Sequence, residues 1–281
     1  MLRLWPDFLS TKVWLAFSID GIAIVQSHAF QKRVLSQQFI KAQSIHESGV
    51  DSPAWQALID QLDEYLAKAV CKKHTQVNVV LSSDFVRYAT LPAQQMVMSN
   101  AEKSAYAHAL FAEIYGVAAQ GWQVKYHVTA PNKNTLAVAV DKLLLAAFKQ
   151  VVVKHQLRLN SVQPYLMMAC NALASQISSV SSHLVLLENS KLLLLHLQKG
   201  ICQQIQVSPY NQDWQPVLNS MLNRELLLNE RLDAADKSLL VYAPTQKDQS
   251  LNAFNGWKTQ RIKSSKNTVL TPPFYMLEAV L

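Results

Sequence analysis

The chain has 281 residues, half of them hydrophobic, and its 26 Lys and Arg residues against 19 Asp and Glu residues give a formal net charge of +7. This length and apolar content allow a substantial core in one or two domains. The longest uninterrupted apolar stretches, such as residues 184–187, fall far short of the roughly 20 residues that cross a bilayer. The composition therefore predicts a globular protein without a membrane span.

The N-terminal sequence and the cysteines both favour a cytoplasmic location. Pro6, Asp7 and Lys12 interrupt the first residues before the apolar core of a signal peptide develops. The three cysteines are widely spaced and include no C-x-x-C pair, so they indicate neither a disulfide framework nor a zinc site. We therefore expect a protein of the reducing cytoplasm that binds no metal.

The positive charge suits an acidic partner, a nucleic acid or an anionic membrane surface. The Lys and Arg residues are weakly clustered, however, and the densest stretches are residues 72–74 and 261–266. Neither stretch contains aromatic residues that could stack on bases. We therefore expect a solvated basic surface and no nucleic-acid partner.

Residues 1–95 have the pattern of an α/β half that opens with a β-hairpin. The hairpin covers residues 13–26 and turns at Asp20-Gly21, a strong two-residue turn signal. Ser52 and Pro53 suit the N-cap and the first position of a helix. The apolar residues of this helix, which should face a sheet, are Trp55, Leu58, Ile59, Leu62 and Leu66. The further extended segments expected here are 34–40, 77–81 and 85–91, the last of them stopped by Pro92.

Residues 96–163 are predicted to form a compact inserted unit. Ser99 and Glu102 have the spacing of a capping box, and Gly116 offers a stop for the helix that begins there. Two strands, a helix and a third strand are expected to follow at 122–129, 136–140, 141–155 and 157–162. The unit therefore has the order α-β-β-α-β.

Residues 164–281 repeat the order of the first half. A helix after Pro164 and a loop at 175–182 are expected to precede a three-stranded meander within 183–207. The turns of this meander should lie at Glu188-Asn189-Ser190 and at Lys199-Gly200. The remaining elements are a helix at 213–229, strands at 238–242 and 257–262, and a short helix after Pro273. Two related α/β halves, 1–95 and 164–281, are therefore expected around the inserted unit.

This order resembles the actin-like ATPase superfamily, whose two halves each carry a ribonuclease-H-like sheet. The resemblance rests on the segments FSIDGIAIVQ, VVLSSDFVRYATLP and LNSVQPYLMMACNAL and on the α-β-β-α-β insertion. Within the superfamily, the chain is similar to the type IV pilus assembly protein PilM, the cytoplasmic part of the type II secretion protein GspL, and the MSHA pilus biogenesis proteins.

The resemblance implies an α/β, actin-like (ribonuclease H-like) two-lobed fold with an inserted α-β-β-α-β subdomain. It also implies a non-catalytic cytoplasmic scaffold for pilus assembly or type II secretion. The partner would be the cytoplasmic tail of an inner-membrane platform protein, through which the scaffold could associate peripherally with the membrane.

In members of the superfamily that bind ATP, an Asp followed by Gly in each hairpin loop organises phosphate and metal. Here the first turn is only Asp20-Gly21, and the second, Glu188-Asn189-Ser190, has no glycine. The chain has six glycines, and they form no Gly-rich loop that could bind adenosine. We therefore expect no cofactor and no catalytic residue. The alternative is an actin-like ATPase or kinase-like enzyme with functional nucleotide binding.

Other hydrolytic chemistries lack their motifs. The sequence contains no G-x-S-x-G and no H-E-x-x-H, and its eight histidines are scattered. A ribonuclease-H-like nuclease would need several carboxylates that converge on metal ions. The acids near predicted strand ends are Asp20, Asp84 and Glu188, and each lies in a predicted turn, where an acid is ordinary.

The candidate partner-binding residues are Phe85, Arg87 and Tyr88. Alternation along the predicted strand places Phe85 and Arg87 on one face, and Val86 and Tyr88 on the other. An Arg beside an aromatic residue is a common interface anchor. The resemblance implies that a partner peptide lies between the first half and the inserted unit, in a groove or on a strand edge near these residues. The alternative is a half-buried edge strand whose Arg87 pairs with a local acid.

A second possible contact surface is the N-terminus, where Trp5, Trp14 and Phe17 could touch a membrane. Arg3 and Lys12 are the cations that would support this contact. Packing of the first strand is the simpler explanation for these aromatics.

Overall fold

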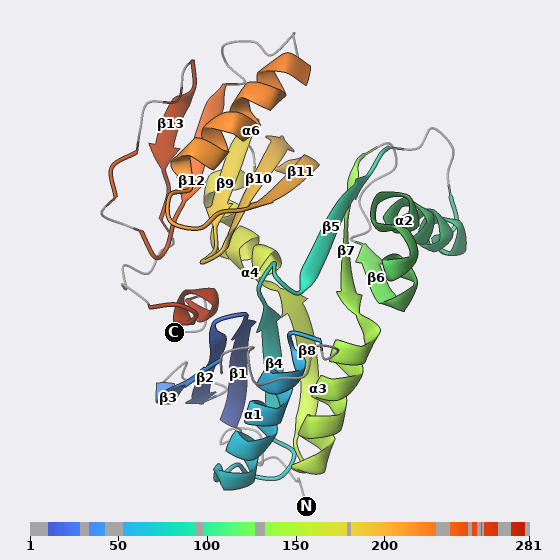
Figure 1. Ribbon diagram of the computed structural model, residues 1–281, viewed down its shortest axis with the longest axis vertical. Coiled ribbons are helices and arrows are strands. Elements are labelled where there is room, and N and C mark those ends of the chain that lie inside the picture. Colours follow the sequence, from blue (N-terminus) through green and yellow to red (C-terminus); the bar gives the residue numbers. More distant parts are fainter. Residues whose placement is uncertain are drawn as a thin grey trace, which may run out of the picture. The chain divides into compact units, whose positions relative to one another are not determined.

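The computed structural model describes residues 11–28, 34–42, 53–93, 98–126, 133–178, 181–228, 237–246, 249–251, 254, 256–263 and 271–278. The chain forms two compact units (Figure 1). Unit 1 comprises Met1–Phe85, Asp141–Ala169 and Leu270–Leu281, and unit 2 comprises Val86–Val140 and Cys170–Val269. Each unit is therefore assembled from segments that are distant in sequence.

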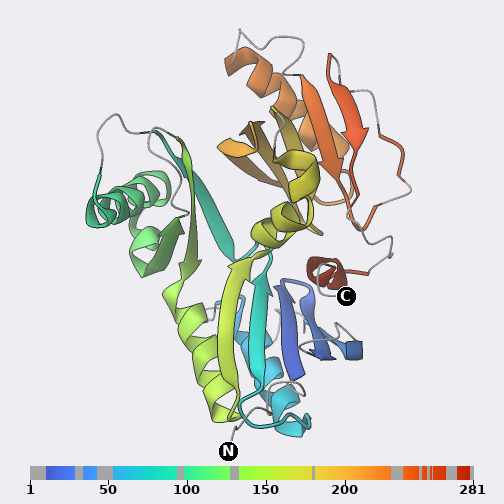
Figure 2. The same cartoon turned by 180° about the vertical axis from the view of Figure 1, so that it is seen from behind.

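Unit 1 is built on a five-stranded sheet with the order β3-β2-β1-β4-β8. The first three strands form an antiparallel meander, and β4 and β8 run parallel to β1. Helices α1 and α3 lie side by side and precede the two parallel strands, as parallel neighbours require a long crossover (Figure 2). The bounds are β1 Thr11–Ser18, β2 Gly21–His28, β3 Val34–Lys41, α1 Gln56–Lys68, β4 Gln76–Leu81, α3 Lys142–Lys154, β8 Arg158–Pro164 and the 3₁₀ helix η4 Phe274–Leu277.

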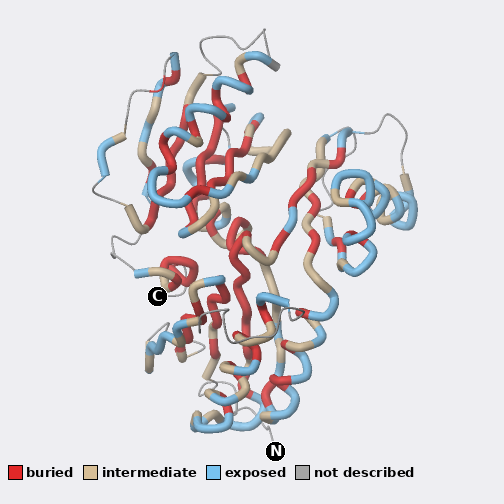
Figure 3. The backbone as a smooth tube through the Cα atoms, in the orientation of Figure 1, coloured by how far each residue is buried: buried red, intermediate tan, exposed pale blue. Residues whose placement is uncertain are grey.

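The core of unit 1 forms around the central strands, which are buried in Figure 3. Phe17 of β1 is fully buried, and its ring centroid lies 4.9 Å from that of Phe148 in α3 and 5.0 Å from that of Phe85. The apolar face predicted for α1 is also buried. Phe17 therefore belongs to the core and is not available to a membrane, while Trp5 lies outside the described residues.

The second half contains a five-stranded sheet with the same plan, in the order β11-β10-β9-β12-β13. Its first three strands again form an antiparallel meander, and β12 and β13 are again parallel to the first strand. Its bounds and those of the associated helices are α4 Tyr165–Ala172, α5 Ala174–Ile177, β9 Ser182–Leu187, β10 Lys191–Gln198, β11 Ile201–Pro209, α6 Gln215–Leu228, β12 Ser238–Tyr242 and β13 Lys258–Arg261. The prediction of two related halves agrees with this repeated topology.

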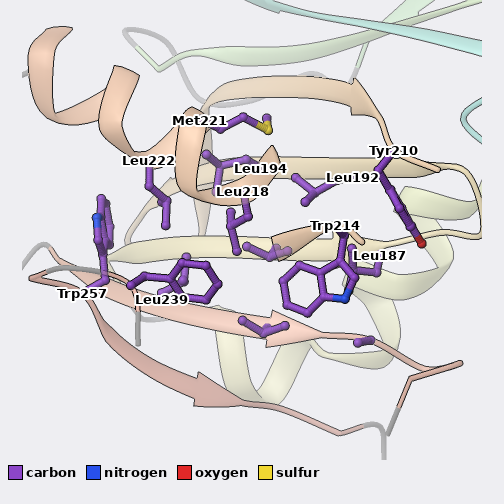
Figure 4. Packing of buried hydrophobic residues seen from close by; sticks show 14 residues of the cluster. Leu187, Leu192, Leu194, Tyr210, Trp214, Leu218, Met221, Leu222, Leu239 and Trp257 are labelled. Carbon is purple, nitrogen blue, oxygen red and sulfur yellow. The ribbon is translucent and has the colours of Figure 1, made fainter. Parts of the chain in front are cut away.

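Helix α6 covers one face of the second sheet through a large apolar cluster (Figure 4). Trp214, at the start of the helix, is fully buried, and Leu218 and Leu222 continue the buried face at helical spacing. They pack on Leu192 and Leu194 of β10. Burial of this surface is what holds α6 to the sheet.

A three-stranded sheet with the order β5-β7-β6 lies in unit 2. Helix α2 packs on it through Phe111 and Ala107, which are fully buried. The predicted capping box is present, since the Ser99 N–H donates to Glu102 Oε2 (2.8 Å) and the Glu102 N–H donates to Ser99 Oγ (3.2 Å). The bounds are β5 Val86–Leu91, α2 Asn100–Tyr115, the 3₁₀ helix η3 Gly116–Gly121, β6 Trp122–Tyr126 and β7 Thr135–Asp141.

Strand pairing distributes the predicted α-β-β-α-β insertion over two sheets. All five elements exist as α2, β6, β7, α3 and β8, but β8 is hydrogen-bonded to β4 in the first sheet. Strand β5, which the sequence predicts in the first half, instead pairs with β7. The difference arises because local pattern predicts an element but not its pairing partner. We therefore propose that the inserted unit spans residues 86–140 instead of 96–163.

Smaller differences concern helix ends. Helix α1 begins at Gln56 after Trp55, with no side-chain cap, whereas Pro53 precedes it and Ser52 lies outside the described residues. Part of the loop predicted at 175–182 is the short helix α5. In the described parts of the chain, every helix is too short or too polar to cross a bilayer.

We expect Gly21→Ala to destabilise unit 1. Gly21 has a φ of +146°, and a Cβ there would clash with the Ile40 carbonyl oxygen and approach the Phe39 ring to 2.7 Å. Backbone strain and the clash together should lower the free energy of unfolding by about 2 kcal/mol or more. Urea unfolding monitored by circular dichroism measures this loss.

The matched control is Gly121→Ala, where no atom lies within 4 Å of an added Cβ and φ is not positive. This variant should unfold like the parent protein. Equal stability of the Gly21→Ala and Gly121→Ala variants would contradict the close packing of β3 on the turn.

Candidate functional site

The β1–β2 turn of unit 1 is the first place where a nucleotide-binding relative would hold phosphate. It consists of Ile19 and Asp20 between the paired residues Ser18 and Gly21. Ser18 Oγ donates to the Gly21 carbonyl oxygen (3.1 Å), and the Ala42 N–H donates to the Asp20 carbonyl oxygen (2.9 Å). The turn is thus tied to β3, and the close approach of β3 explains the glycine without a phosphate.

The β9–β10 turn is the corresponding place in unit 2, and a tyrosine closes it. The Tyr210 hydroxyl donates to the carbonyl oxygen of Glu188, and the Tyr210 N–H donates to the Ser190 carbonyl oxygen (3.1 Å). The Glu188 N–H donates across the turn to the Lys191 carbonyl oxygen (2.9 Å). A phosphate cradle needs several backbone N–H groups that point outward. Here those of Glu188 and Tyr210 are used within the protein.

Burial and a neighbouring charge keep the Tyr210 hydroxyl protonated by raising its pKa. Tyr210 is buried in the cluster beneath α6 (Figure 4), and burial, with a smaller contribution from the charge of Glu188, raises the pKa of Tyr210 to about 12. Its hydroxyl therefore remains a hydrogen-bond donor at neutral pH. The side chain therefore stays bonded to the Glu188 carbonyl oxygen in the turn.

The segment that follows β12 is also held by side chains. The Arg261 guanidinium donates to the carbonyl oxygens of Gln246 (2.5 Å) and Gln249 (2.6 Å). Trp214 Nε1 donates to Gln249 Oε1 (2.9 Å). An arginine and a tryptophan thus hold Gln246 and Gln249, and Gly256 is the one glycine of the sequence between β12 and β13, so this segment does not resemble a Gly-rich adenosine loop.

The three predicted partner-binding residues have different environments. Phe85 is half-buried against Phe17, in the core of unit 1. Tyr88 is buried, and its carbonyl oxygen accepts a hydrogen bond from the Tyr115 hydroxyl (3.4 Å). Arg87 is exposed. Of the three, Arg87 is the side chain that a partner could contact directly.

Arg87 lies beside an aromatic cluster that sequence reasoning missed. Its cross-strand partner is Ala139, which belongs to the face packed on α2. On that side, Tyr115 packs edge-on against Trp122 at 5.1 Å. Burial raises the pKa of Tyr115, and the charge of Arg87 partly opposes this shift. We call Arg87, Tyr115 and Trp122 the Arg87 surface.

The carboxylates that a nuclease would need are explained locally. Ser82 Oγ donates to Asp84 Oδ2 (2.9 Å), as in an ordinary turn. Asp20 belongs to unit 1 and Glu188, which is buried, belongs to unit 2. Among the residues that the structure describes, no group of three His, Cys, Asp or Glu side chains could hold a metal ion.

A buried polar cluster under α6 was also missed by sequence reasoning. The rings of His183 and His196 stack at 4.7 Å, and His183 Nε2 lies 4.0 Å from Glu225 Oε2. Gln206 Nε2 donates to Glu225 Oε1. The two histidines are directly paired across β9 and β10, a relation that local pattern cannot reveal. The cluster links α6 to the sheet by polar contacts.

Comparison with known proteins identifies the fold. No protein-family model and no curated protein matches the sequence. The cytoplasmic domain of EpsL, an inner-membrane component of the type II secretion system of Vibrio cholerae, matches with a TM-score of 0.57 and 13% identity over 96% of this chain and 94% of that chain. A Bacteroides thetaiotaomicron protein with an actin-like ATPase fold and unknown function matches with a TM-score of 0.56 and 12% identity over 87% of both chains.

A third solved structure, the PilM–PilN type IV pilus biogenesis complex, matches with a TM-score of 0.55 and 12% identity over 84% of this chain and 81% of that chain. Identities this low carry information on the fold and not on activity. The chain therefore has the actin-like fold, which confirms the fold predicted from the sequence.

We expect Tyr210→Phe to lower the free energy of unfolding by about 1–2 kcal/mol at neutral pH, because it removes the buried donor to Glu188. The pKa of Tyr210 is raised from 10.0 to about 12 in the folded protein, so its contribution is complete below pH 10 and is lost as the pH rises towards 12. The difference between parent and variant should therefore shrink over this pH range. Urea unfolding followed by tryptophan fluorescence measures it.

Tyr126→Phe is the control, since the Tyr126 hydroxyl donates to Asn100 at the surface (3.0 Å). Its stability should stay close to that of the parent. A Tyr210→Phe variant as stable as this control would show that the turn does not depend on the tyrosine hydroxyl.

Proposed function

We propose that this protein is a non-catalytic cytoplasmic scaffold that binds a membrane-platform protein of pilus assembly or type II secretion. The observation that carries the proposal is the β9–β10 turn, in which Tyr210 takes the place of an open phosphate loop. The structural neighbours support it, since one is an inner-membrane component of a secretion system and another is part of a pilus biogenesis complex.

In this proposal, the protein keeps the actin-like fold but lacks the groups that bind a nucleotide. Triphosphate binding needs converging N–H donors and a metal held by carboxylates. The first turn of this chain is short and tied to β3, and the second is filled by a side chain. A frame of this kind retains its surfaces for protein contacts, which do not require the lost groups.

The partner would bind at the Arg87 surface. An exposed guanidinium offers charge-assisted, bidentate hydrogen bonds to a carboxylate, and neighbouring aromatics supply apolar contact area. A short cytoplasmic segment with an acidic residue beside an apolar one has the matching chemistry. In this proposal Phe85 and Tyr88 act indirectly, by packing the two ends of the segment that carries Arg87.

We expect Mg-ATP to produce no measurable heat of binding in isothermal titration calorimetry at concentrations up to the millimolar range. The physical reason is the small number of donors that the two turns offer. Micromolar affinity would contradict the proposal and support the ATPase or kinase-like alternative. In that case Asp20→Ala should abolish turnover, because Asp20 is the acid in the first turn.

We expect Arg87→Glu to abolish capture of the membrane partner from detergent-solubilised native membranes, as measured by pull-down and mass spectrometry. The reversed charge would repel the carboxylate that the guanidinium binds. Lys125→Glu is the control, because Lys125 is an exposed residue of the same three-stranded sheet and the charge change is identical. Equal capture by both variants, or recovery of no envelope protein by the parent, would contradict this assignment.

A further inference from the structure

The topology of unit 1 gathers basic residues at one end of its sheet. Strands β1, β4 and β8 are parallel, and Lys12, Gln76 and Arg158 lie in register across them, so all three strands begin at the same end. Helices α1 and α3 lead back to the starts of β4 and β8, so they finish there, at Lys68 and Lys154. The basic end of unit 1 is made up of Lys12, Lys68, Lys72, Lys73, Lys154 and Arg158.

Most of these cations are exposed to solvent, and few acids of the described helix ends neutralise them. Lys68, Lys72, Lys73 and Arg158 are all exposed. Asp63, on the last turns of α1, is occupied by Lys154 (2.5 Å) and His155 (2.7 Å), and hydrogen bonds from these two residues lower its pKa. Glu64 is the other acid in the final turns of α1. The ends of α1 and α3 are therefore positively charged.

Exposed apolar side chains lie among the cations. Val70 is 99% exposed between Lys68 and the pair Lys72–Lys73, and Val153, next to Lys154, is 61% exposed. A fully exposed valine gains nothing from folding, whereas burial of its side chain against a partner would be favourable. Exposed cations next to an exposed apolar side chain are typical of a surface that binds an anionic bilayer.

We propose that the basic end of unit 1 binds directly to the anionic headgroups of a lipid bilayer, with Val70 entering the interface. A single-stranded nucleic acid would be held by stacking as well as by charge, and residues 68–74 and 153–158 contain no Phe, Tyr or Trp. A duplex would be held by charge but would gain nothing from the exposed Val70. The lipid surface is therefore the partner that the chemistry favours. This contact involves none of the residues of the Arg87 surface and needs no protein partner.

The test is co-sedimentation of the purified full chain with vesicles. The protein should bind vesicles of phosphatidylglycerol and phosphatidylcholine, bind pure phosphatidylcholine vesicles far more weakly, and be released by high salt. The combined variant Lys72→Glu, Lys73→Glu, Arg158→Glu should bind at least about 100-fold more weakly, since each cation near an anionic membrane contributes roughly fivefold in affinity.

The matched control is Lys125→Glu, Lys258→Glu, Lys263→Glu, which changes the net charge equally at exposed residues of unit 2. It should retain most of the lipid binding. Val70→Ser should weaken binding several-fold without loss of thermal stability, because Val70 makes no packing contact in the fold.

Three outcomes would overturn the proposal. They are equal binding to anionic and neutral vesicles, equal weakening by the two triple variants, and tighter binding to duplex DNA or RNA that vesicles cannot displace. Because only protein and lipid are present, failure here leaves the proposed protein partner untouched. Failure of the pull-down would likewise leave the lipid contact untouched.

Discussion

Parallel pairing beside the opening hairpin determines the arrangement of each five-stranded sheet. Strand β1 is bonded to β2 on one side and to the parallel strand β4 on the other, and β9 is bonded to β10 and β12 in the same way. The hairpin turns therefore lie where the parallel strands end, and in unit 1 the helices finish where those strands begin. The β1–β2 turn and the ends of helices α1 and α3 therefore lie at opposite ends of the first sheet.

Within this arrangement, side chains hold the second hairpin turn and the segment after β12. The hydroxyl and the backbone N–H of Tyr210 donate to carbonyl oxygens of the second turn. The Arg261 guanidinium donates to a carbonyl oxygen of the segment after β12. Both side chains donate to backbone carbonyl oxygens and so fix the backbone at these places. Under the proposed function, this internal bonding at the second turn would oppose nucleotide binding there.

The elements of the fold could be predicted because their signals are local. Asp20-Gly21 predicted the hairpin, although the two turn residues are Ile19 and Asp20 and Gly21 already pairs with Ser18. Ser99 and Glu102 predicted the capping box, and the spacing of Leu58, Leu62 and Leu66 predicted the buried face of α1. The pairing of β5 with β7 could not be predicted in this way, because it joins segments about 50 residues apart whose apolar patterns would suit either sheet.

The candidate site shows the same division between local and distant signals. Alternation correctly separated the exposed Arg87 from the buried Val86 and Tyr88. Alternation could not reveal that Tyr115, which packs on Trp122, lies near Arg87, because Tyr115 belongs to α2 and Trp122 to β6. The available clue was the pair of aromatic residues on each side of Gly116. Their contact becomes evident only when α2 is packed on the sheet.

The carboxylate of Asp63 is shared by two basic residues at the end of α3, Lys154 and His155. It fastens the ends of two helices to each other and also cancels part of the charge they carry. Loss of this acid would make the surface more cationic while loosening the scaffold that presents it. The charge of this surface and the connection between its two helix ends therefore both depend on Asp63, so a substitution there would change the two together.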